Sequence, residues 1–205
     1  ADELDPALIE GVFRAAHNPR ISSGLGVIPR VVANGRAIYR GKMSLHEAEG
    51  RIARYWTPYH HALRDLIEES MRLFGQAVLV DCHSMPHEAI ETHARPGQPT
   101  PEVVLGDRFG AAAGRAVVDR IETAFVDAGL RVVRNAPFAG AYIAQAYGRP
   151  LRNQHVVQIE VDRSLYMNEA RIERSAGFAA FAALMSGVVA EIAGIGRRAL
   201  PLAAE

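Results

Sequence analysis

Residues 76–86 read QAVLVDCHSMP, a stretch in which a short apolar run is followed at once by polar side chains. The run from Gln76 to Val80 is rich in β-branched residues and predicts a buried strand, and the residues from Asp81 onward predict a polar loop. Polar groups at the C-terminal end of a strand are well placed for chemistry in open α/β sheets. This stretch therefore predicts both a core strand and a candidate site at its end.

The rest of the chain alternates strand and helix patterns around that stretch. A second β-branched run, Gln154–Val161, predicts another buried strand, and Val103–Leu105 and Leu130–Arg134 predict shorter ones. An amphipathic helix is predicted over Phe109–Ala128, before Gly129, and an apolar helix over Phe178–Ile195. This alternation predicts an α/β fold in three layers, a mixed or parallel central sheet with helices on both faces, built as a single domain over residues 1–205.

The N-terminal third predicts smaller elements. Asp5–Ala16 is expected to form a short helix, and the runs 27–32 and 37–39 around Asn34-Gly35 are expected to form a hairpin. Ser44 followed by Glu47 has the spacing of a capping box, so a helix is expected to begin there. Pro58 is expected to end or kink that helix, and a second helix is expected to end near Gly75.

Composition excludes several classes of function. The chain has 23 acidic and 23 basic residues, which argues against a nucleic-acid partner. Its most apolar stretch, within 178–195, is interrupted by Ser186, Gly187 and Glu191, so no membrane span is expected. The first residues are acidic and form no basic, apolar leader, so no signal peptide is expected. Cys82 is the single cysteine, which excludes an internal disulfide and fits a reducing compartment, so a cytoplasmic location is expected.

His83 and Glu160 are the two candidate catalytic residues. A histidine just beyond a buried strand can offer one ring nitrogen to a metal while the other meets an orienting carboxylate, and Asp81 is two residues away. The alternative is a histidine held only by loop hydrogen bonds. Glu160, at the end of an apolar strand, is expected to be desolvated enough to serve as a general base, and its alternative is an ion pair with a nearby arginine.

Other polar residues give weaker signals. Arg163 has a guanidinium suited to a substrate carboxylate, although a structural pair is the common role for such an arginine. The adjacent His60 and His61 cannot share a helix face and are interpreted as structural. His87 and His93 lie in a long loop, where solvated histidines are common and auxiliary metal ligands are rarer. Nucleophilic catalysis is poorly supported, because Cys82 is expected to face the core and Ser84 lies in no Gly-x-Ser-x-Gly turn.

Several strings taken together, in their order along the chain, resemble the N-formylglutamate amidohydrolase family, which is related to the zinc carboxypeptidases. The two most specific strings contain His83 and Glu160. The resembling strings are Gly26-Val27-Ile28-Pro29-Arg30, Ile38-Tyr39-Arg40, Tyr55 to His60, Asp81-Cys82-His83-Ser84-Met85-Pro86, Leu105-Gly106-Asp107-Arg108-Phe109-Gly110 and Gln158 to Met167.

This resemblance implies a phosphorylase/hydrolase-like fold related to the zinc carboxypeptidases, and a hydrolase that depends on a divalent metal, expected to be zinc. It implies that His83 is a metal ligand, that Glu160 is the general base, and that Arg30 and Arg163 bind the carboxylates of a small acidic N-acyl amino acid. Metal coordination would lower the pKa of a water molecule and polarise the amide carbonyl. The products would be formate and glutamate.

The chain departs from the family pattern at its beginning. Family members normally start with a strand carrying Pro-His-Ser-Gly, followed by an acidic ligand position and Asp-x-Asn-Arg, and none of these occurs here. The N-terminal segment of the family is therefore expected to be missing, and the resemblance supplies one metal ligand where catalytic zinc usually needs three. A non-catalytic binding or regulatory domain that keeps the fold is one alternative. A related amidohydrolase or peptidase acting on another acidic substrate is the other.

Overall fold

The computed structural model describes residues 4–13, 19–32, 35–91 and 99–195. These residues divide into two compact units, Ala1–Leu66 and Ile67–Glu205. The boundary falls inside one long helix, α3 (Thr57–Phe74). Each unit is described by itself below, and the single-domain organisation stays a prediction.

The N-terminal unit contains α1 (Pro19–Ser22), α2 (Leu45–Arg51), the π-helical turn η2 (Ile52–Trp56) and the first part of α3. The predicted cap is confirmed, because the Oγ of Ser44 accepts a hydrogen bond from the backbone N–H of Glu47 at 3.2 Å. Pro58 does not end the helix, which continues from α2 through η2 into α3. Proline cannot donate a backbone hydrogen bond and crowds the preceding turn, and the wider π turn lies just before it.

Two other predictions for this unit met different outcomes. The helix predicted over Asp5–Ala16 is wrong for its described part, which forms turns. The Oδ1 of Asp5 accepts from the N–H of Ala7 at 2.8 Å, and Gly11 has a φ of 76°, a conformation that interrupts a helix. The predicted hairpin is present as one antiparallel bridge between Val31 and Ala37, with Asn34 outside the described residues.

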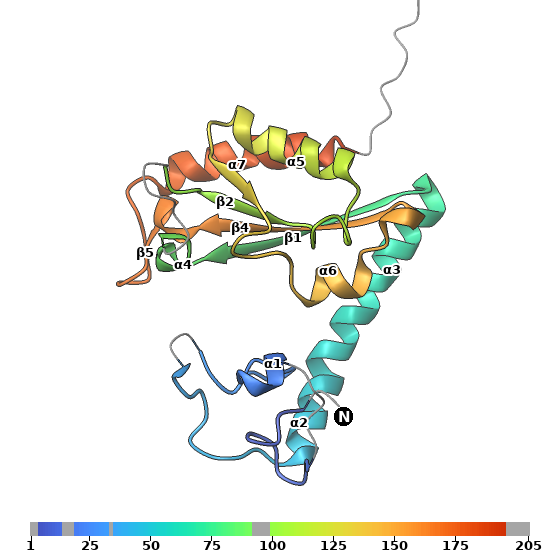
Figure 1. Ribbon diagram of the computed structural model, residues 1–205, viewed down its shortest axis with the longest axis vertical. Coiled ribbons are helices and arrows are strands. Elements are labelled where there is room, and N and C mark those ends of the chain that lie inside the picture. The colour runs from blue at the N-terminus through green and yellow to red at the C-terminus, as the bar shows by residue number, and fades with distance from the viewer. Residues whose placement is uncertain (1–3, 14–18, 33–34, 92–98, 196–205) are drawn as a thin grey trace, which may run out of the picture. The chain divides into compact units, whose positions relative to one another are not determined.

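The C-terminal unit is built on a four-stranded mixed sheet in the order β1-β4-β2-β3 (Figure 1). Its strands are β1 (Ala77–Met85), β4 (Gln154–Asp162), β2 (Val103–Gly106) and β3 (Val132–Arg134). β1 pairs with β4 in parallel, β2 pairs with β3 in parallel, and β2 runs antiparallel to β4. The predicted mixed sheet is confirmed.

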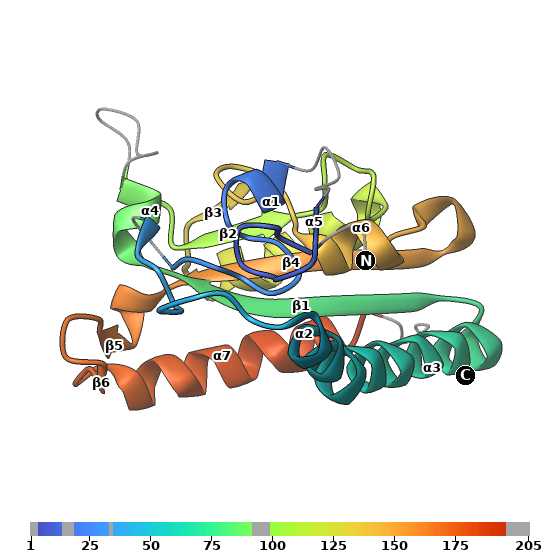
Figure 2. The ribbon, with the colours of Figure 1, turned by 90° about the horizontal axis from the view of Figure 1, so that it is seen from below.

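Helices cover both faces of this sheet, which confirms the three-layer α/β fold (Figures 1 and 2). α5 (Arg115–Asp127) and α7 (Phe178–Ala193) pack on one face, and α6 (Tyr142–Tyr147) packs on the other. The main core lies under α5 and α7. Its fully buried members include Phe125, Ile121, Val118, Leu105, Val103 and Val157. On the α6 face, Val156, Ala144 and Ala112 form a smaller cluster.

Two element boundaries differ from the prediction. β1 runs to Met85 and includes the polar residues predicted to form a loop, because β4 pairs with it along its whole length. α5 begins at Arg115 rather than Phe109, because Arg108, Phe109 and Gly110 all have positive φ, which no helix accommodates. The remaining short elements are α4 (His87–Glu91), η3 (Pro150–Arg152), η4 (Arg163–Leu165), β5 (Met167–Asn168) and β6 (Glu173–Arg174). Within the described ranges, none of the helices has the length and apolar character to cross a membrane.

Candidate active site

The pairing of β1 with β4 brings the two predicted catalytic residues together. His83 lies directly opposite Glu160, and Asp81 lies opposite Gln158. Because side chains two residues apart on a strand share a face, all four lie on the sheet face opposite α5 and α7. His83 and Glu160 therefore lie on neighbouring strands, with Nδ1 of His83 and Oε1 of Glu160 3.6 Å apart.

His83 has a carboxylate on each side of its ring. Its Nε2 lies 3.1 Å from Oδ1 of Asp81, within hydrogen-bond distance, whereas its Nδ1 lies 3.6 Å from Glu160. A neutral imidazole has one N–H and one lone pair, so the shorter contact assigns the proton to Nε2 and leaves the Nδ1 lone pair on the Glu160 side. The side chain is 41% exposed, so this nitrogen is accessible.

Asp81 carries an oxygen without a partner. Its Oδ2 is buried and has no hydrogen-bond partner among the described residues, while Oδ1 contacts His83. A buried carboxylate oxygen without a donor is costly unless a proton or a cation offsets its charge. The pair of Asp81 and His83 is therefore suited to a positive ion nearby.

Glu160 is buried, with 7% of its surface exposed. Burial raises the pKa of its carboxyl above the ordinary value. The charge of His83, a hydrogen bond from Gln158 and the charge of Arg163 oppose that shift, and the charge of Asp81 adds to it. A carboxyl with a raised pKa binds a proton more readily than an exposed one, which is the property that a general base requires.

Gln158 is a member of this group that the sequence analysis did not single out. It is 3% exposed, and its Nε2 donates to Oε1 of Glu160 at 2.8 Å. The spacing contained a usable signal, because a polar residue two positions before Glu160 on a buried strand must share its face.

The two candidate arginines have other contacts in the structure. Arg163 donates from Nε to the Ser84 hydroxyl at 3.2 Å and from Nη2 to the Ser84 carbonyl at 2.9 Å, and its Nη1 lies 3.8 Å from Glu169. Arg30 belongs to the N-terminal unit, where its Nε donates to Oδ2 of the buried Asp5 at 2.9 Å. The substrate-binding roles of both arginines stay predictions.

The other histidines named in the sequence analysis lie apart from this group where the structure describes them. His60 is buried against Trp56 and Tyr59, and burial lowers its pKa, whereas the adjacent His61 is exposed. His87 lies between Asp162 and Glu91, as described below, and His93 lies outside the described residues.

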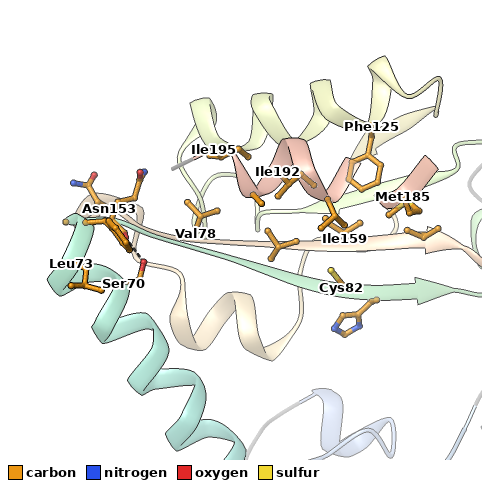
Figure 3. A pocket seen from close by; sticks show the side chains of 18 residues that line it. Ser70, Leu73, Val78, Cys82, Phe125, Asn153, Ile159, Met185, Ile192 and Ile195 are labelled. Carbon is orange, nitrogen blue, oxygen red and sulfur yellow. Dashed lines mark hydrogen bonds between the residues drawn. The ribbon is translucent and has the colours of Figure 1, made fainter. Parts of the chain in front are cut away.

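Cys82 does not face the core as predicted but is exposed. It lies on the α7 side of β1, at a pocket of about 1310 Å³ with a mainly apolar lining that includes Val80, Ile159 and Met185 (Figure 3). Among the described strands, β1 lies at one edge of the sheet and pairs only with β4. Burial and the charge of Asp81 raise the pKa of the Cys82 thiol, which does not favour a nucleophilic thiolate.

Among the residues that the structure describes, no three His, Cys, Asp or Glu side chains gather into a group able to hold a metal ion. The group at the ends of β1 and β4 therefore offers one imidazole and neighbouring carboxylates, short of the three protein ligands typical of catalytic zinc. What this arrangement can do by itself is position a water molecule beside a buried base.

Comparison with known proteins shows which families and structures the chain is similar to. The family model of N-formylglutamate amidohydrolase matches residues 1–167. N-formylglutamate deformylases from Pseudomonas aeruginosa and Pseudomonas putida are 33% and 30% identical to the chain over 147 residues, which is 70% of this chain and 54% of each relative. The chain thus spans about half the length of the curated relatives it matches.

Solved structures give a consistent picture of the fold. The crystal structure of N-formylglutamate amidohydrolase from Ralstonia eutropha JMP134 is 34% identical, with a TM-score of 0.83, and the match covers 95% of this chain and 70% of that one. A gene product from Agrobacterium tumefaciens, 17% identical with a TM-score of 0.52, covers 82% of this chain and 63% of that one and shares the fold alone.

Proposed function

The chain belongs to the N-formylglutamate amidohydrolase family, and from this premise we propose that it takes part in metal-dependent hydrolysis of the amide of N-formylglutamate, or of a similar N-acyl acidic amino acid. The products are formate and glutamate. The observation that carries the proposal is the pairing of His83 with the buried Glu160 on adjacent strands, 3.6 Å apart. A small-molecule substrate and a cytoplasmic location, which the single cysteine supports, are parts of the same proposal.

We propose zinc as the divalent metal, with His83 as one ligand of a site that the described residues supply only in part. His83 offers Nδ1 as a ligand, Asp81 holds the ring through Nε2, and the unpartnered Oδ2 of Asp81 favours a cation nearby. When bound, the metal supplies a Lewis acid that polarises the amide carbonyl and lowers the pKa of water.

Glu160 carries the proton transfers in this proposal. Its carboxylate removes a proton from the attacking water and delivers it to the amide nitrogen as the C–N bond breaks, so formate and the free amino group leave with the protons balanced. Burial supports this role because it raises the pKa of the carboxyl toward the range in which a base works well near neutral pH.

Two arginines are proposed to bind the substrate carboxylates. One edge of the Arg163 guanidinium contacts Ser84, so a substrate would have to bind at Nη1, which lies 3.8 Å from Glu169. Arg30 has its Nε on Asp5, which leaves its terminal nitrogens for a carboxylate. If the two arginines bind the substrate, Arg30→Met and Arg163→Met should each raise KM for N-formylglutamate. A lowered Tm with an unchanged KM would show a structural role instead.

The direct test is formate release from N-formylglutamate by the purified protein, first stripped with a chelator and then supplied with Zn²⁺. Activity that appears only with the metal supports the proposal. Parallel assays on N-acetyl and N-formimino glutamate measure how strictly the acyl group is selected. Tight binding of N-formylglutamate without any turnover in the presence of metal would instead favour the non-catalytic binding domain.

A further inference from the structure

Gln158 has an orientation that the structure fixes without ambiguity. The backbone N–H of Ala141 donates to its Oε1 at 2.7 Å. An N–H can only donate, so the side-chain oxygen must face Ala141 and the amide nitrogen must face the other way. That nitrogen donates to Oε1 of Glu160 at 2.8 Å. The amide therefore connects a fixed backbone group to the candidate base.

The backbone at Ala141 is itself held close to the sheet. Gly106, at the end of β2, is the antiparallel partner of Gln158 on β4. A Cβ at Gly106 would lie 2.6 Å from the backbone nitrogen of Gly140 and 2.9 Å from the carbonyl oxygen of Phe138. Only glycine permits so close an approach, and that approach brings the Ala141 N–H within reach of Gln158.

We propose that Gln158 is a positioning residue that holds the Glu160 carboxylate in the orientation needed for proton transfer. This inference rests on the proposed function, in which Glu160 is the base. Oε1 of Glu160 accepts from Gln158 and faces Nδ1 of His83, so the hydrogen bond from Gln158 holds this oxygen toward the proposed metal ligand. A buried side chain with both ends of its amide engaged limits rotation of the carboxylate, and fixed geometry of a reacting group is a large part of catalytic rate.

The test replaces Gln158 by methionine, which keeps the length of the side chain and removes both hydrogen bonds. In the Zn²⁺-loaded protein, Gln158→Met should lower kcat on N-formylglutamate about 10–100-fold, the usual effect of losing an outer partner of a site residue, with little change in KM. Gln154→Met is the matched control. Gln154 lies at the other end of β4, and its side-chain amide is likewise bonded to the backbone, because its Nε2 donates to the carbonyl of Tyr147. The kcat of Gln154→Met should stay within about twofold of wild type.

A second variant covers the case in which Gln158→Met fails to fold. Gln158→Leu also removes both hydrogen bonds, with a different apolar side chain that suits a buried strand, so kcat should fall by a similar factor. Crystal structures give a readout independent of activity. The Glu160 carboxylate should be rotated or displaced in the Gln158 variants and unmoved in Gln154→Met.

The outcomes separate this inference from the proposed function. An unmoved carboxylate and a kcat equal to that of the Gln154 control would overturn the role of Gln158 and leave Glu160 untouched. Unchanged turnover in Glu160→Gln would remove the base itself, and with it the function proposed above. Loss of turnover in both Glu160→Gln and the Gln158 variants, with a displaced carboxylate in the latter, supports both.

Discussion

Burial and hydrogen bonding shift the pKa of the Glu160 carboxyl in opposite directions. Burial favours its protonated form, while the hydrogen bond from Gln158 favours its ionised form. Such a balance allows a carboxyl to gain and release a proton during one turnover. This balance supports the general-base role that we propose for Glu160.

Replacing Glu160 by glutamine removes the base and preserves its size. In the metal-loaded protein, kcat on N-formylglutamate should fall by about 10²–10⁴-fold, the usual worth of general acid–base assistance, with KM and bound metal nearly unchanged. Steady-state kinetics measure kcat and KM, and elemental analysis of the same sample measures the bound metal. Turnover within about twofold of wild type would remove Glu160 from the mechanism.

Replacing His83 by alanine should lower the metal content of the purified protein, because a site that depends on few protein ligands loses affinity when one of them is removed. The measurement is elemental analysis after equilibration with a fixed concentration of free Zn²⁺. His61→Ala, which removes an exposed histidine from α3, serves as the control. A folded His83 variant with the metal content of this control would return His83 to a structural role.

At the scale of single residues, the sequence predicted part of the candidate site. His83 and Glu160 were identifiable because each follows an apolar, β-branched run, a local pattern. The unpartnered Oδ2 of Asp81 and the two-sided contacts of Gln158 depend on strands that are far apart in sequence, on the loop before α6, and on the register between β1 and β4. No local pattern carries such information.

At the scale of elements, the junction between α4 and β4 depends on one histidine. His87, at the start of α4, has its Nδ1 2.7 Å from Oδ2 of Asp162, at the end of β4, and its Nε2 3.2 Å from Glu91. The backbone N–H of His87 also donates to Glu169 at 2.8 Å. The hydrogen bond to Asp162 raises the pKa of the His87 imidazole, with smaller contributions from the charges of both carboxylates.

This raised pKa gives a stability contribution with a defined sign. A histidine whose folded pKa exceeds its unfolded value stabilises the folded state fully below about pH 6.5, and the contribution is lost as pH rises through the folded value. His87→Gln should therefore lower Tm near pH 6 and have little effect above about pH 8.5. The side chain is 38% exposed, so the effect should not exceed about 1 kcal/mol. A Tm difference that is constant across this pH range would contradict the assignment.

The packing of α5 onto the sheet offers a sharper test of the core. Phe125 is fully buried under α5, while the next residue, Val126, is 51% exposed. Phe125→Ala should reduce the free energy of unfolding by about 3–5 kcal/mol, through lost burial and the cavity left behind. Val126→Ala on the same helix should change it by no more than about 0.5 kcal/mol. Chemical denaturation measures both, and equal effects would show that α5 does not pack as described.

Elements were predictable where burial is strong and local. β4 and α7 were predictable from the sequence because their apolar runs are long. The end of α3 was predictable from Gly75, which has a positive φ. The C-terminal half of β1 was mistaken for a loop because its polar residues are held in a strand only by pairing with β4, more than 70 residues away in sequence. The helix predicted over Asp5–Ala16 failed because an Asp5 turn competes with the helix, an outcome that composition does not distinguish.

At the scale of the whole molecule, the family resemblance and the fold were predictable because their motifs extend along most of the chain. The division into two compact units was not, since it depends on which distant residues pack together. The N-terminal unit has its own cluster of Leu4, Leu8, Ile9, Met43 and Ala48, and the C-terminal unit has its own sheet core. Each unit therefore has an apolar interior that periodicity alone assigned to a single domain.

The position of β1 at the edge of the four-stranded sheet has a consequence for the motions of the molecule. β4 is hydrogen-bonded on both sides, whereas β1 has one neighbour among the described strands. Amides exchange with solvent through local opening, and elements bonded on one side open at lower free energy than central ones. The strand that carries His83 is thus the less protected partner of the two that form the candidate site.

Hydrogen–deuterium exchange should therefore show β4 amides among the slowest in the C-terminal unit and those of β1 measurably faster, in the metal-free protein. Binding of Zn²⁺ to His83 should slow exchange in β1 more than in β4, because an ion that binds only the closed form makes opening more costly. Equal protection of both strands, with no response to metal, would contradict this expectation. With the expected result, loading of the metal would also fix the position of the strand that binds it.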